Sequence, residues 1–166
     1  MADVEFIQTP NTLRKAKIGS GPGKLDKNLL AEAEKAIEAF GEGFTDWIQE
    51  DLDNMEAARL QLSQGENPER ALADLYRIAL DLKGQGTSFG YDVVSAVGGS
   101  LTDFMLPIKE AGTTLTPLQL EVVTAHVGAI RAVFSEELKG DGGATGQALL
   151  NGLARIVVKA NAASAR

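Results

Sequence analysis

Few side chains in this chain could act as nucleophiles or metal ligands, because His126 is the only histidine among 166 residues and cysteine is absent. Carboxylates are plentiful, but Glu50 and Asp51 belong to an acidic run typical of a solvated helix face. Thr87 and Ser88 have no neighbouring histidine that could activate them. Phosphate-loop, nucleophile-elbow and zinc-protease motifs are missing. We therefore predict a binding or regulatory protein that is not an enzyme and needs no metal or cofactor.

The stretch 75–91, LYRIALDLKGQGTSFGY, carries the clearest pattern. Its apolar residues recur at steps of three and four and predict a helix with one buried face, formed by Leu72, Leu75, Ile78, Ala79, Leu82 and Phe89. Leu80 lies about 150° from the centre of that face, so we expect it to point outward. Its neighbours on the helix surface are Tyr76, Arg77, Lys83 and Gly84. Closely spaced glycines at 84, 86 and 90 indicate close approach by another backbone or by a partner.

The run DLKGQG-x-SFGY resembles the signature of histidine-containing phosphotransfer (HPt) domains of bacterial phosphorelays. In that signature a histidine is followed by lysine three residues on, glycine four on and often glycine ten on. Lys83, Gly84 and Gly90 occupy the lysine and glycine positions, whereas Leu80 occupies the position of the phosphorylated histidine. The resemblance extends over a helical pattern from about 43 to 138. It also includes the flanking residues Asp81, Leu82, Gln85, Gly86, Ser88, Phe89 and Tyr91.

The resemblance implies an all-α fold, an up-down four-helix bundle of HPt type with additional N- and C-terminal helices. It implies that the lysine offsets phosphoryl charge and that the glycine leaves room for an incoming receiver domain. Leucine has no nucleophilic atom, so no phosphoramidate can form at position 80. We therefore expect a protein that binds a response-regulator receiver domain, or another histidine-kinase pathway component, without phosphotransfer. The expected contacts are Tyr76, Arg77, Leu80, Lys83, Gly84 and Thr87, with Gln85, Gly86 and Gly90 serving the motif's structure.

Two other interpretations remain open at this point. The chain could be an active phosphotransfer protein that uses His126, although this residue lies about 50° from the centre of its helix's apolar face, which favours a structural role. It could also be a helical scaffold or dimerisation module on the same fold, with Leu80 simply a surface leucine or covered by another segment. Leu80 could itself be an introduced replacement for a histidine.

Helical periodicity covers most of the chain, and no strand pattern is found. We expect a flexible N-terminal arm over 1–24 and a single domain over 25–162. The first expected helix covers 25–40, is interrupted or kinked at Gly41 and Gly43, and resumes to about 64. The other expected helices are 68–88, 91–106, 117–138 and 144–161. Asn67 and Thr116 are candidate N-caps, Pro107 is expected to end or kink its helix, and Trp47 is expected to anchor the core.

The formal net charge of −7 argues against nucleic-acid binding, which requires a basic surface. The acidic N-terminus has no apolar run typical of a signal peptide, and no stretch approaches 18 consecutive apolar residues. We therefore expect a cytoplasmic protein with no membrane partner.

Overall fold

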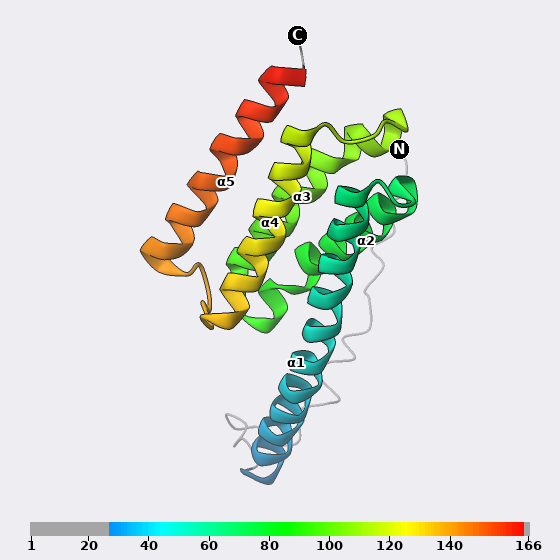
Figure 1. The fold of residues 1–166 in the computed structure, drawn as a ribbon. Coiled ribbons are helices and arrows are strands. Elements are labelled where there is room, and N and C mark those ends of the chain that lie inside the picture. Colours follow the sequence, from blue (N-terminus) through cyan, green and yellow to red (C-terminus); the bar gives the residue numbers. More distant parts are fainter. Residues whose placement is uncertain (1–26, 165–166) are drawn as a thin grey trace, which may run out of the picture. The chain divides into compact units, whose positions relative to one another are not determined.

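A computed structural model of the chain describes residues 27–164 and divides the chain into two compact units, 1–40 and 41–166. Five α-helices occur among the described residues and no strand does, which confirms the all-α prediction (Figure 1). The predicted arm over 1–24 and the side chain of Trp47 lie outside the described residues and side chains. Because the unit boundary falls after Phe40, the fold is described below for residues 41–164 alone.

The helices follow one another with short connections. They are α1 (Lys27–Gln64), α2 (Pro68–Gln85), the short 3-10 helix η2 (Thr87–Phe89), α3 (Asp92–Ala111), α4 (Pro117–Ser135) and α5 (Gly143–Ser164). Along the chain α2 packs against α3, α3 against α4 and α4 against α5, and α5 also contacts α3 (Figure 1). Of the helices that the structure describes, none is long and apolar enough to cross a membrane.

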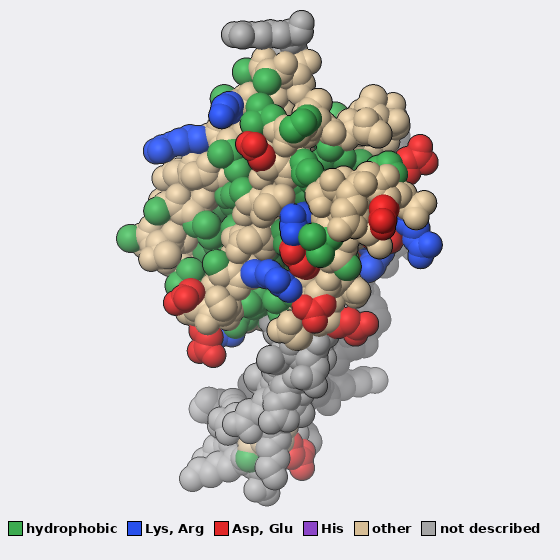
Figure 2. All heavy atoms as spheres, in the orientation of Figure 1, with side chains coloured by type: hydrophobic (Ala, Val, Ile, Leu, Met, Phe, Trp, Pro, Cys, Tyr) green, Lys and Arg blue, Asp and Glu red, His purple; other side chains and the backbone are tan. Residues whose placement is uncertain are grey.

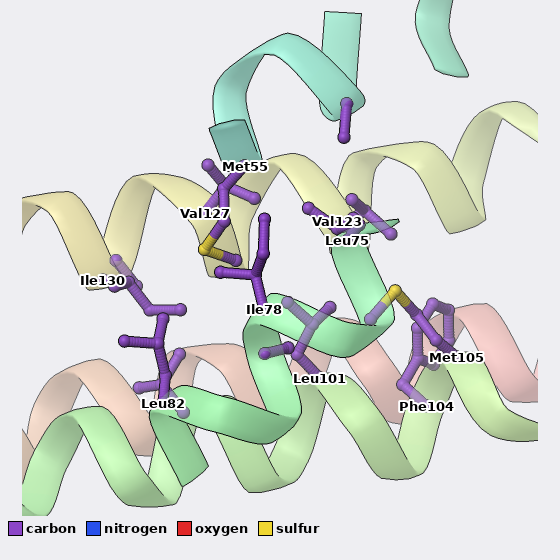
Figure 3. Packing of buried hydrophobic residues seen from close by; sticks show 14 of the residues in the cluster. Met55, Leu75, Ile78, Leu82, Leu101, Phe104, Met105, Val123, Val127 and Ile130 are labelled. Atoms are coloured by element: carbon purple, nitrogen blue, oxygen red, sulfur yellow. The ribbon is translucent and has the colours of Figure 1, made fainter. Parts of the chain in front are cut away.

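One hydrophobic core draws on the C-terminal half of α1 and on α2, α3 and α4, and α5 adds Leu153 and Ala160. Figure 3 shows Met55 of α1 and Ile78 of α2 pointing into the same space as Leu101 of α3 and Val127 of α4. All four side chains are at most 1% exposed. Burial of a side chain of this size stabilises the fold by roughly 1.5–3 kcal/mol, so this core fixes the orientation of α2 and hence of its outward face.

The α4–α5 seam is lined by small residues. A shallow apolar groove runs along it, bordered by Ala125, Gly128, Ala132, Gly152 and Leu153. Figure 2 shows hydrophobic side chains gathered over these two helices, where few charged side chains lie. The small side chains allow α5 to lie close to α4.

Neither predicted helix end is found, and a kink at Gly41, Gly43 or Pro107 stays a prediction. α1 continues through Gly41 and Gly43, since a glycine in a helix costs only about 1 kcal/mol relative to alanine. α3 continues through Pro107 to Ala111. Ile108, beyond the proline, is 7% exposed, and its burial offsets the backbone hydrogen bond that proline cannot make.

Several helix ends also differ from the prediction. α4 ends at Ser135 because Glu137 adopts a positive φ of 49°, which a helix cannot accommodate. Asn67 does not cap α2 through its side chain, since its own φ is 43°, outside the extended region that an N-cap requires. The predicted N-cap at Thr116 is confirmed. The backbone N–H of Gln119 donates to the Thr116 hydroxyl, and the Thr116 N–H donates to the Gln119 side chain.

Candidate partner-binding face of α2

The outward side of α2 brings together the residues that the sequence singles out. Leu80 is 46% exposed, whereas Ile78, Ala79 and Leu82 beside it are buried. The candidate residues Arg77, Lys83 and Gly84 are also exposed, and Tyr76 is half-buried beside Lys109, whose Nζ lies 5.4 Å from the ring centroid. An apolar side chain therefore projects from the middle of a rigid, well-anchored helix, as the helical period predicts. We call the six candidate contacts the Leu80 face: Tyr76, Arg77, Leu80, Lys83, Gly84 and Thr87.

Close packing of α3 supports this face from below. A Cβ atom added to Gly98 would lie 2.8 Å from the Ala79 carbonyl oxygen and 3.0 Å from the Lys83 backbone nitrogen. Real Cβ atoms do not approach backbone atoms this closely, so only glycine fits here. This close packing places α3 directly against the backbone that carries Leu80 and Lys83.

The Lys83 side chain lies across α3. A Cβ atom on Gly99 would meet the aliphatic stem of Lys83 at 3.6–3.9 Å, and Lys83 Nζ lies 3.5 Å from Asp103 Oδ1. Both side chains are largely exposed, so the ion pair contributes less than about 1 kcal/mol. Asp103 is therefore part of this surface. The sequence alone does not indicate that Asp103 belongs here, because it lies 20 residues from Lys83 and only the α2–α3 packing brings the two together.

Arg77 is also held by acidic groups. Its Nη1 lies 3.2 Å from Asp81 Oδ2, one turn along α2. The buried carboxyl group of Asp51, on α1, interacts electrostatically with both residues. Burial raises the pKa of Asp51, and the positive charge of Arg77 opposes that shift. Both cations that flank Leu80 are thus accompanied by carboxylates.

Asp51 corrects the prediction of a solvated acidic face. The residue is 6% exposed, and its Oδ2 atom has no hydrogen-bond partner among the described residues. It lies next to the buried Leu52 on the inner side of α1. A buried carboxyl oxygen without a hydrogen-bond partner costs on the order of 1–3 kcal/mol, so Asp51 destabilises the fold.

The three motif glycines differ in what requires them. A Cβ at Gly84 would meet nothing within 4 Å, whereas a Cβ at Gly86 would lie 2.7 Å from Ser95 Oγ and 2.9 Å from the Tyr91 carbonyl oxygen. Gly90 has a φ of 77°, which favours glycine. The fold therefore requires glycine at 86 and 90 but leaves the surface at Gly84 open.

Thr87 at the end of the Leu80 face is tied to α3. Its backbone N–H donates to Ser95 Oγ at 2.9 Å, and its hydroxyl lies 3.1 Å from the same oxygen. Beyond it, Phe89 and Tyr91 line a separate hollow of about 480 Å³, together with Ile48, Arg131 and Phe134. The Tyr91 and Phe134 rings lie 4.7 Å apart. The aromatic end of the motif thus packs inward and does not extend the Leu80 face.

His126 is fully buried in α4, at 0% exposure. Its Nδ1 lies 2.8 Å from the Val122 carbonyl oxygen, which can only accept, so Nδ1 carries the proton. Nε2 lies 3.0 Å from Ser100 Oγ and accepts from that hydroxyl. Burial lowers the pKa of His126 and keeps the ring neutral. Neither nitrogen is open to a reactant, so the geometry is that of a core histidine.

Within the described part of the chain, no group of three or more His, Asp or Glu side chains is arranged to hold a metal ion. Comparisons with protein-family models, curated proteins and solved structures gave no match. Among the described residues, the Leu80 face is therefore the main candidate for a functional surface.

Proposed function

We propose that this chain is an HPt-like signalling protein without a phosphoacceptor, and that it binds response-regulator receiver domains through the Leu80 face. The observation that carries the proposal is the exposure of Leu80, at 46%, at the acceptor position of the motif. Lys83 and the open backbone of Gly84 lie within one turn of it. Apolar groups at the centre of an exposed surface are typical of protein docking sites.

The proposal also concerns how the helices are arranged. The C-terminal half of α1 together with α2, α3 and α4 would form the four-helix bundle of HPt type, with α5 as the additional C-terminal helix. The core supports this arrangement, because its largest fully buried side chains all come from these four helices. In such a bundle the middle of α2 is the docking site.

The proposed mechanism is occupancy. A receiver domain that docks on the Leu80 face meets a side chain that cannot attack phosphorus, so no phosphoryl group leaves the receiver's aspartate. The bound receiver is withheld from other partners while the complex lasts. Pathway output would then depend on the concentration of this protein and on its affinity for the receiver.

Of the two alternatives, phosphotransfer through His126 is the weaker. Phosphotransfer through His126 requires an imidazole nitrogen in line with an aspartyl phosphate, whereas both nitrogens of His126 are engaged inside the core. A dimerisation module would bury Leu80 against a second copy. No residue of the Leu80 face favours a second copy over a receiver, and the oligomeric state of the chain tests dimerisation.

The test is a phosphotransfer assay against a panel of phosphorylated receiver domains, paired with direct binding measurements. We expect the chain to bind at least one receiver and to remain unlabelled, and Leu80→His to take up acid-labile phosphate from the same receiver. Leu60→His is the matched control, because Leu60 is 42% exposed on α1 but lacks the Lys-Gly motif. The control should stay unlabelled.

Each other result has a clear meaning. If the chain binds no receiver and Leu80→His stays unlabelled, the proposed function fails. A concentration-dependent dimer that Leu80→Arg dissociates would then establish the dimerisation module. If the unaltered chain is itself labelled and His126→Ala abolishes the label, phosphotransfer through His126 replaces the proposal.

A further inference from the structure

The Leu80 face has a charge arrangement that bears on which form of a receiver it accepts. Resting on the proposed function, we propose that this face selects the unphosphorylated receiver domain and discriminates against the phosphorylated one. The inference follows from three features: the apolar side chain at position 80, the position of Lys83, and the carboxylates that accompany both nearby cations.

The side chain at position 80 would face the receiver's phosphorylatable aspartate. A phosphoryl group carries close to two negative charges at neutral pH and needs hydrogen-bond donors. Leu80 offers none. Removing a charged group from water without a replacement partner is strongly unfavourable, so docking of the phosphorylated form is penalised at the centre of the contact.

Lys83 is poorly placed to compensate. Its stem lies along Gly99, and its Nζ is 3.5 Å from Asp103. The lysine is therefore directed across α3, toward Asp103. To reach a phosphoryl group it would have to leave Asp103, and the freed carboxylate would remain on the same surface as a like charge.

The remaining charges act in the same direction. Arg77 pairs with Asp81 and interacts with the buried Asp51. Around Leu80, Arg77 and Lys83 are thus accompanied by three carboxyl groups, those of Asp51, Asp81 and Asp103, while a third cation, Lys109, lies over the Tyr76 ring at the edge of the face. A partner surface that gains negative charge meets more repulsion here, whereas an unphosphorylated receiver presents less charge to the same groups.

The experiment compares two forms of one receiver. The receiver that binds most tightly in the panel is titrated with the full chain, once in Mg²⁺ alone and once in Mg²⁺ with beryllofluoride, which mimics the phosphoryl group. We expect the dissociation constant to be at least about fivefold lower without beryllofluoride, a preference typical of changes in charge complementarity at an interface.

Two charge variants distinguish a preference caused by the Leu80 face from one caused by conformational changes inside the receiver. Asp103→Asn releases Lys83 and removes a carboxylate, so we expect it to reduce the preference by about half or more. Asp53→Asn is the matched control, because Asp53 also forms an ion pair between two helices, at 3.1 Å to Arg131, and involves no residue of the Leu80 face. Asp103 and Asp53 side chains are 78% and 65% exposed, so both variants should fold normally.

The possible outcomes distinguish failure of the proposed selectivity from failure of the proposed function. If neither form of any receiver binds, the proposed function fails and the inference with it. Equal or tighter binding of the beryllofluoride form overturns the inference alone. So does a preference that Asp103→Asn leaves unchanged, because it would belong to the receiver's own conformational change.

Discussion

Leu80 and His126 occupy each other's expected environments. Leu80 is an apolar side chain exposed to solvent on α2, whereas His126 is a titratable side chain of α4 that is buried in the core. The first position therefore contributes little to folding and is available to a partner. The second contributes to folding and is unavailable to a partner. The difference shows that residue type alone does not locate function in this protein, since its single histidine is fully buried.

The largest expected effect tests this contrast through stability. His126→Ala removes a fully buried ring and its hydrogen bonds to Ser100 and Val122, so we expect a loss of about 2–4 kcal/mol in the free energy of unfolding. Leu80→Ala should change it by no more than about 0.5 kcal/mol, as is usual for surface substitutions. Urea denaturation followed by circular dichroism measures both. Equal losses in the two variants would mean that Leu80 is packed, and the contrast would be broken.

The next largest effect on stability comes from two glycines, Gly98 on α3 and Gly84 within the Leu80 face. Gly98→Ala forces a Cβ against the backbone of Ala79 and Lys83, and we expect a loss of about 1–3 kcal/mol. Gly84→Ala meets open space and should raise stability by about 0.5–1 kcal/mol, because alanine favours a helix. The same denaturation experiment checks both changes.

Receiver binding sharpens the comparison of these glycines. If Gly84 is there for a partner, the stabilised Gly84→Ala variant should bind its receiver more weakly than the unaltered chain does. Unchanged affinity would remove Gly84 from the Leu80 face without affecting the other residues.

The smallest effects are pH dependences of opposite sign. Burial lowers the pKa of His126 below 6.5, so the unfolded chain takes up a proton first and stability falls as the pH drops below about 6.5. Burial raises the pKa of Asp51 above 3.8, so the folded chain holds its proton longer and stability falls as the pH rises through the raised pKa. Each effect is at most about 1.4 kcal/mol per pH unit.

Two variants show which residue causes each pH dependence of stability. His126→Leu should flatten the stability profile between pH 7.5 and 5.5, measured by urea midpoints. Asp51→Asn should remove the acid-side dependence and raise stability near pH 7 by up to about 1 kcal/mol, since it eliminates a buried charge. A loss of stability in Asp51→Asn would show that the attraction to Arg77 outweighs the cost of burial.

Local patterns predict the helices and the side of α2 that Leu80 occupies. The helical period places Leu75, Ile78 and Leu82 inward and Leu80 outward, because these positions depend only on spacing along one helix. The cap at Thr116 is predictable for the same reason, since its partner Gln119 is three residues away. Whether the assembly matches an HPt bundle stays a prediction.

Features that depend on packing between helices could not be predicted. The ion pair of Lys83 with Asp103 depends on how closely α2 and α3 pack, and Asp51 is buried although its neighbours Glu50 and Asp53 are exposed. Pro107 remains inside α3 because Ile108 is buried beyond it, which no local rule conveys. In each case tertiary contacts outweigh a local tendency of the sequence.

The unequal demands on the motif glycines have a consequence for how such a sequence changes over evolutionary time. Selection for folding alone would retain Gly86, which has no room for a side chain, and Gly90, whose backbone is left-handed. A chain whose surface no longer bound a partner would therefore still carry these two glycines. Gly84 is under no such constraint and would drift freely once no partner docked there. Among chains of this kind, the residue at position 84 should report whether a docking surface is still in use, and the glycines at 86 and 90 only that the fold survives.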